Sequence, residues 1–276
     1  DGTNDQIVTM RMLFNGTEQF PENELIAVLR SFGASFGADI NAYTSYDETV
    51  YQLTMPTADP SVVSTGLDVL QQWLSAATID PDQVVAERGV VLDEWRGSAQ
   101  SANGRVFDEI QKFFLDGSPY ENRRPIGTDN EITSTTAEPL RAFYDDWYRP
   151  DNAAVVVVGD IDVIEMEKQI IERFDPAAER GDSPERVDLV VEPATEARSL
   201  VFADPDVSEG AAFVTLPLAR DLSGTQEEIV QRDIYGALAF DIIGTRLSND
   251  ALRGEAPFDN AFVDSSSFVR LLDAPE

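Results

Sequence analysis

Two Asp-Pro dipeptides constrain the fold of this chain more than any other feature. Asp59-Pro60 and Asp80-Pro81 each join a residue that caps helix N-termini to a proline suited to the first helical position. Apolar residues follow each dipeptide at helical spacing. The sequence therefore predicts two consecutive helices, over residues 60–77 and 81–96, with further helices over 104–115, 137–148 and 162–174.

Strand-like segments alternate with these helices. "DINAYTSYDETVYQLTMP" predicts two strands around a turn near residues 45–47, and the β-branched run Ile7–Leu13 predicts another strand. The consecutive valines of "NAAVVVVGDID" predict a buried strand over 152–162. We therefore expect an α+β fold, a mixed β-sheet backed by helices, followed by the beginning of a second similar domain.

The amino-acid composition of the chain changes after residue 175. Residues 176–197 hold three prolines and many charges, which is typical of a linker between domains. After it, 198–276 is predicted to give two strands, a long helix and a final strand, and then the chain ends. We expect a first domain over 1–175, a linker over 176–197 and an incomplete second domain over 198–276.

Composition excludes several classes of chemistry. The chain contains no cysteine and no histidine, so disulfides, thiolate nucleophiles, Ser-His-Asp triads and imidazole metal ligands are absent from it. The net charge of −31 disfavours binding to nucleic acid or to anionic lipid. No apolar run is long enough to cross a membrane, and residues 1–20 have no signal-peptide pattern. Acidity without cysteine suits the bacterial periplasm or an extracellular setting, although a cytoplasmic chain can share both properties.

Four segments in order resemble the M16 family of zinc metallopeptidases, the group of insulin-degrading enzyme, pitrilysin and the mitochondrial processing peptidase. The first is "FNGTEQFPENEL", similar to the stretch that follows the family's zinc motif. The second is "GADINAYTSYDETVYQL", similar to its substrate strand and hairpin. The third is "ERGVVLDEWR", similar to its distal glutamate helix, and the fourth is "FYDDWYRPDNAAVVVVGDID", similar to the strand that closes its first domain.

The resemblance implies a Zn²⁺ site and names residues for it. The family's H-x-x-E-H motif supplies two histidine ligands and a general base, and a later helix supplies a glutamate ligand. By position Glu94 matches that ligand, and Glu87, seven residues earlier on the same helix face, matches the supporting carboxylate. Aligned without a gap, the motif positions fall on Ile7, Val8, Thr9, Met10 and Arg11.

Because none of these five side chains can bind zinc or act as the base, two interpretations remain open. If Ile7–Leu13 is the family's first strand, a segment carrying the motif is missing between about Leu13 and Phe14. We favour this alternative, in which the parent protein is a zinc endopeptidase that cuts unstructured peptides and the chain as it stands is inactive. Otherwise the motif is lost, and the chain is an inactive M16-like subunit that acts as a scaffold or peptide-binding partner.

The resemblance also implies partners. Asn41, Ala42 and Thr44 match the strand to which an extended peptide substrate adds along a sheet edge. Active members of the family enclose the peptide between two half-molecules. We therefore expect an unstructured peptide and a second M16 half or subunit as partners, with no nucleic acid and no membrane span.

Overall fold

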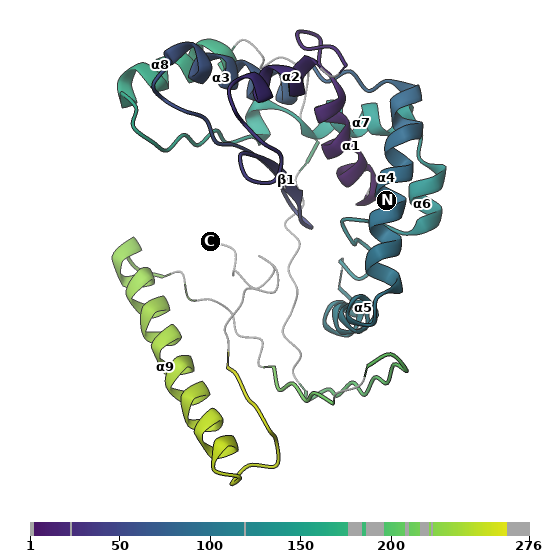
Figure 1. Ribbon diagram of the computed structural model, residues 1–276, viewed down its shortest axis with the longest axis vertical. Helices are drawn as coiled ribbons and strands as arrows, with labels where there is room; N and C mark the ends of the chain where they lie inside the picture. Colours follow the sequence, from purple (N-terminus) through teal and green to yellow (C-terminus); the bar gives the residue numbers. More distant parts are fainter. Residues whose placement is uncertain are drawn as a thin grey trace. The chain divides into compact units, whose positions relative to one another are not determined.

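The computed structural model divides the chain into two compact units (Figure 1). It describes residues 3–22, 24–118, 120–175, 184–185, 196–207, 210–215, 221 and 223–263. One unit contains Asp1–Arg186 together with Phe202–Ser208, and the other contains Val187–Val201 and Glu209–Glu276. Most of the expected linker and of the final strand lies outside the described residues. The domain boundaries expected from the sequence therefore stay a prediction.

Helices make up most of the described structure. Eight of those described, and a short 3-10 turn at Pro150–Asn152, belong to the first unit, and the long helix α9 belongs to the second. The helices are α1 (Thr3–Asn15), α2 (Glu24–Ser31), α3 (Pro60–Ser75), α4 (Pro81–Gln100), α5 (Ala102–Leu115), α6 (Asp129–Ser134), α7 (Ala137–Trp147), α8 (Val163–Phe174) and α9 (Gln226–Leu252).

Both Asp-Pro dipeptides begin helices, as the sequence predicts. The side chain of Asp59 accepts a hydrogen bond from the backbone N–H of Ser61 at 2.9 Å and caps α3. That of Asp80 accepts from Asp82 at 2.9 Å and from Gln83 at 3.1 Å and caps α4. These bonds satisfy N–H groups that no helical carbonyl can reach, which is why the dipeptides locate the helix starts so closely.

The predicted hairpin is also confirmed. Strands β1 (Ile40–Thr44) and β2 (Thr49–Leu53) pair antiparallel, with Ala42 opposite Tyr51. Within the described residues these two strands form the whole sheet, so the sheet is smaller than expected. The helices of the first unit supply the remainder of an α+β fold.

The strand expected at Ile7–Leu13 is wrong, because these residues lie inside α1. Val8, Met12 and Leu13 are fully buried, and α1 contacts α4, α7, α2, α6 and β1. Burial around most of the helix makes its sequence nearly continuously apolar, and a short apolar run does not distinguish a buried helix from a strand. Since α1 continues through Leu13 and Phe14 to Asn15, the argument for a missing segment at that point loses its basis.

The buried strand expected from the valine run is wrong as well. Residues 153–158 are irregular, and the side chains of Val156 and Val158 are 80% and 92% exposed. Within the described part of the chain no strand lies beside this run to form a ladder, and an isolated strand is not stable in water. The described parts of 198–215, expected to form two strands, are likewise irregular. A short helix that the sequence did not predict, α6, begins with a capping box between Thr128 and Glu131.

The core of the first unit is built around α1. Val8, Met12 and Leu13 of α1 belong to a cluster of buried side chains that also includes Leu29 of α2 and Ile40 of β1. The cluster continues through α3, α4, α6 and α7, with these members: Val69, Trp73, Val84, Val91, Ile132, Leu140 and Tyr144. The core therefore fixes α1 against α4, which carries the predicted site.

Within the described residues no helix is both long and apolar enough to cross a membrane.

Candidate functional site

Helix α4 presents the two predicted carboxylates to α1. Glu94 forms an ion pair with the guanidinium of Arg11, and Glu87 accepts a hydrogen bond from the side-chain amide of Asn15 at 3.1 Å. Arg11 and Asn15 are four residues apart on α1, and Glu87 and Glu94 are seven apart on α4, so each pair occupies one helix face. The structure therefore brings both predicted acids together against the same face of α1.

The ion pair lies at the margin of the core rather than within it. The side chain of Arg11 is 30% exposed and that of Glu94 is 47% exposed. Beside Arg11 on the helix, Ile7 and Met10 are buried at 7% and 8% exposure. The face of α1 that the gapless alignment assigns to the zinc motif therefore consists of apolar packing and one cation.

These residues do not fit a zinc ion. Zinc in proteins takes thiolate, imidazole and carboxylate donors, and the sequence contains neither cysteine nor histidine. Among the described residues no three acidic side chains gather in a way that could hold a metal ion. A guanidinium only donates hydrogen bonds and stays protonated, so Arg11 cannot be a ligand, and its contact uses the carboxylate that a metal would need.

The turn after α1 explains the "FNGT" sequence without a catalytic role. A Cβ added to Gly16 would lie 2.7 Å from the backbone nitrogen of Glu22 and 3.1 Å from Oγ1 of Thr78. The carbonyl of Gly16 accepts from the backbone N–H of Thr78 at 3.1 Å, and the buried Thr17 forms a bridge with Ala77. The close approach of these backbones requires glycine at position 16.

The predicted peptide-binding residues lie on β1. Asn41 is exposed, Ala42 and Thr44 are partly buried, and the N–H of Ala42 donates to the side chain of Asn41 at 2.9 Å. Thr44 faces the partner strand, because its hydroxyl lies 3.1 Å from that of Thr49. A peptide strand that adds to β1 would therefore find one backbone donor, the N–H of Ala42, already hydrogen-bonded to the side chain of Asn41.

A cluster of aromatic side chains packs α1 and the hairpin against α3. Phe14 of α1 packs edge-on against Trp73 of α3 with ring centres 5.0 Å apart, and Tyr51 of β2 packs on the same indole at 5.2 Å. The hydroxyls of Tyr51 and Tyr148 are 2.7 Å apart, and burial raises the pKa of both phenols. Both phenols therefore stay neutral near pH 7, and one hydrogen bond joins their hydroxyls.

Sequence reasoning placed the two glutamates but missed their partners. The sequence assigns Arg11 only to a position of the zinc motif, and Asn15 only to the "FNGT" stretch that follows that motif. The signal that could have found them was present: an i, i+4 pair of hydrogen-bond donors on α1 matches an i, i+7 pair of acids on α4. Reading it required α1 to be recognised as a helix.

Two family models match the chain. Residues 8–124 match "Insulinase (Peptidase family M16)", and residues 134–250 match "Peptidase M16 inactive domain". The first match begins inside α1 and includes the hairpin and the α4 carboxylates. The second begins at the end of α6 and continues into α9.

Relatives and solved structures agree with these matches. The chain is 42% identical over 151 residues to a probable zinc protease PqqL of Escherichia coli, covering 55% of this chain and 16% of that protein. It is 31% identical over 270 residues to the Haemophilus influenzae protein of the same name, covering 94% of this chain and 27% of the relative. A crystal structure of the first half of the periplasmic protease PqqL from Escherichia coli superposes with a TM-score of 0.77 at 29% identity, over 93% of this chain and 54% of that one. The matched part of the chain thus corresponds to 16% and 27% of the lengths of these two curated relatives.

Proposed function

The chain belongs to the M16 (insulinase) family of peptidases, and from that premise we propose that it is a non-catalytic member, which binds peptide or a partner chain without cleaving it. The observation that carries the proposal is the ion pair between Arg11 and Glu94. Peptide hydrolysis of the kind its relatives are named for needs a metal-bound water and a base beside it. The face of α1 offers an arginine, a methionine and an isoleucine in those places.

Zinc binding is the direct test. The purified chain, dialysed against Zn²⁺ and then against buffer, is expected to retain no stoichiometric metal by elemental analysis. It is also expected to leave a fluorogenic unstructured peptide uncut. Stoichiometric zinc in the unaltered chain, displaced by chelator, would overturn the proposal.

A gain-of-site variant sharpens this test. Ile7→His, Met10→Glu and Arg11→His together restore the H-x-x-E-H pattern on α1, beside Glu94. We expect this triple variant to bind one zinc ion. A matched control adds Glu94→Gln, which removes the third protein ligand and should weaken zinc binding at least about tenfold. A circular dichroism spectrum equal to that of the unaltered chain shows that both variants are folded.

We propose β1 as the binding edge for an extended peptide. Support comes from the exposure of Asn41 and from the position of Asn41, Ala42 and Thr44 on a strand that pairs with one neighbour in the described structure. Hydrogen exchange tests this: an unstructured peptide should slow exchange of amides 40–44 and leave α8 unchanged. The control is the same peptide with alternate N-methylated residues, which cannot complete a ladder. Protection by both peptides alike, or by neither, would refute strand addition.

We also propose a location and a partner for the chain. Similarity to the first half of a periplasmic protease supports a periplasmic location and a second M16 half or subunit as a partner. Such a half could contribute catalytic groups that this chain lacks. Size-exclusion chromatography of the complete natural protein, with its zinc content, would test whether the second half carries them.

A further inference from the structure

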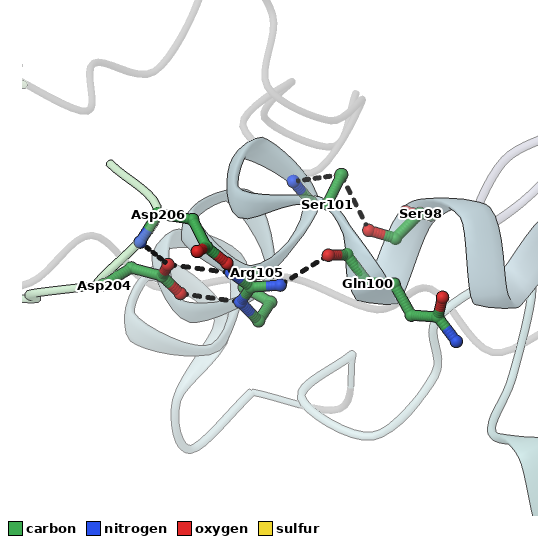
Figure 2. A network of polar contacts seen from close by, with 7 residues as sticks. Ser98, Gln100, Ser101, Arg105, Asp204 and Asp206 are labelled. Atoms are coloured by element: carbon green, nitrogen blue, oxygen red, sulfur yellow. Dashed lines mark hydrogen bonds and ion pairs between the residues drawn. The ribbon is translucent and has the colours of Figure 1, made fainter. Parts of the chain in front are cut away.

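The corner between α4 and α5 is tightly built. The hydroxyl of Ser101 donates to the carbonyl of Ser98 at 2.9 Å and accepts from the backbone N–H of Gly104 at 3.0 Å (Figure 2). A Cβ on Gly104 would lie 1.8 Å from the Ser98 oxygen, so only glycine fits there. This corner fixes the first turn of α5 and with it the position of Arg105.

Arg105 uses its guanidinium to hold three groups. Nε and Nη2 donate to the two carboxylate oxygens of Asp204 at 2.6 and 2.8 Å, and Nη2 also donates to Asp206 at 2.7 Å (Figure 2). Nη1 donates to the carbonyl of Gln100 at the end of α4, at 2.5 Å. The planar fork of arginine matches a carboxylate in this two-bond geometry, which a lysine cannot reproduce.

The contact is unusually well enclosed for a pair in this acidic chain. The side chain of Asp204 is only 6% exposed, whereas that of Asp206 is 70% exposed. Hydrogen bonds from Arg105 lower the pKa of Asp204 to about 2, so its carboxylate is fully charged under ordinary conditions. By contrast, the pair of Arg96 with Asp93 within α4 is more than half exposed on both sides.

Asp204 also accepts hydrogen bonds from two backbone N–H groups that follow it in the chain. Its carboxylate accepts from the N–H of Asp206 at 3.0 Å, and its carbonyl accepts from the N–H of Val207 at 3.1 Å. The stretch Phe202–Ser208 is part of the first unit, although the residues on both sides of it belong to the second. The chain therefore returns to α5 about a hundred residues after Arg105.

We propose that Arg105 is a latch that holds the turn at residues 204–207 on α5. The latch contains one cation and two carboxylates, so releasing it uncovers the buried carboxylate of Asp204 and frees the turn at residues 204–207. The latch requires neither zinc nor a bound peptide, so its test is independent of the function proposed above.

Hydrogen exchange of the full chain tests the latch. The probe is the exchange rate of the Asp206 and Val207 amides, compared with those of α1 and α3. Asp204→Asn removes the charge at nearly constant shape and should speed exchange of these two amides about tenfold or more. Asp206→Asn should have a smaller effect, because its carboxylate is mostly solvated.

Two further variants separate the latch from general stabilisation. Arg105→Lys keeps the charge but loses the fork, so we expect it to speed exchange as Asp204→Asn does. Asp250→Asn breaks an exposed pair with Arg253 in α9 and should leave residues 204–207 unchanged. Unchanged exchange in Asp204→Asn would overturn the latch. An equal increase throughout the first unit would overturn it too, since that result means loss of overall stability.

Discussion

At the scale of single residues, position 11 decides what Glu94 does. A carboxylate on the exposed margin of a helix can bind a metal, pair with a cation or simply be hydrated. Arg11 lies four residues before Asn15 on α1, which places its guanidinium against Glu94. A guanidinium carries its charge at every physiological pH, so this pairing does not depend on protonation of Arg11. The predicted metal ligand is thereby an ion-pair residue.

The hydroxyl of Tyr144 forms two buried hydrogen bonds in the core. It donates to the carbonyl of Trp73 at 2.9 Å and accepts from the N–H of Ala77 at 3.1 Å, and all these atoms are buried. Tyr144→Phe leaves both backbone groups unsatisfied, so we expect a loss of about 2–3 kcal/mol in the free energy of unfolding. Tyr43→Phe, on an exposed ring, should change it by less than about 0.5 kcal/mol.

Urea unfolding followed by tryptophan fluorescence measures this difference, because all three tryptophans lie in the first unit. Equal unfolding midpoints for the two variants would mean that the two hydrogen bonds of Tyr144 contribute nothing to stability.

At the scale of elements, the sequence predicts a helix well where it contains the residue that caps the helix. It fails where contacts with neighbouring elements decide between helix and strand. The carboxylates of Asp59 and Asp80 complete the first turns of α3 and α4, so those helices could be predicted from a few residues. Helix α1 has no such described cap, and its apolar run is compatible with either structure. Its contacts with α4, α7 and β1 made it a helix.

Two glycines, one in a helix and one in a turn, are expected to respond in opposite ways to the same substitution. Gly89 lies in α4 with nothing within 4 Å of an added Cβ, so Gly89→Ala should stabilise the first unit by about 0.5–1 kcal/mol through helix propensity. Gly16→Ala drives a methyl group into the backbone of Glu22 and should cost about 1–3 kcal/mol.

The same urea titration checks both glycine variants. A destabilised Gly89→Ala would indicate that α4 needs its flexibility, and a neutral Gly16→Ala would show that the turn after α1 can widen.

At the scale of the whole molecule, the chain carries a large excess of negative charge. The chain carries 51 acidic and 20 basic residues, and most of the described ion pairs are at least partly exposed. Self-repulsion of this kind destabilises the compact state, and salt screens it.

Raising NaCl from about 20 mM to about 500 mM shortens the screening length from roughly 20 Å to roughly 4 Å. We therefore expect the midpoint of urea unfolding to rise. KCl should act equally, because screening does not depend on the identity of the monovalent cation. A midpoint that falls with salt would mean that the ion pairs outweigh the repulsion.

The sequence by itself determined the family resemblance, the helix starts at the Asp-Pro dipeptides, the hairpin and the pairing of Glu87 with Glu94 on one face. Each depends on neighbours within about two helical turns or on residue types alone. The tertiary structure decided that the run at residues 7–13 is a helix, that the valines at 155–158 form no strand, and that Arg11 and Arg105 meet Glu94 and Asp204. The first two outcomes depend on burial, and the two arginine pairs join residues 83 and 99 positions apart, so they follow only once the tertiary packing is known.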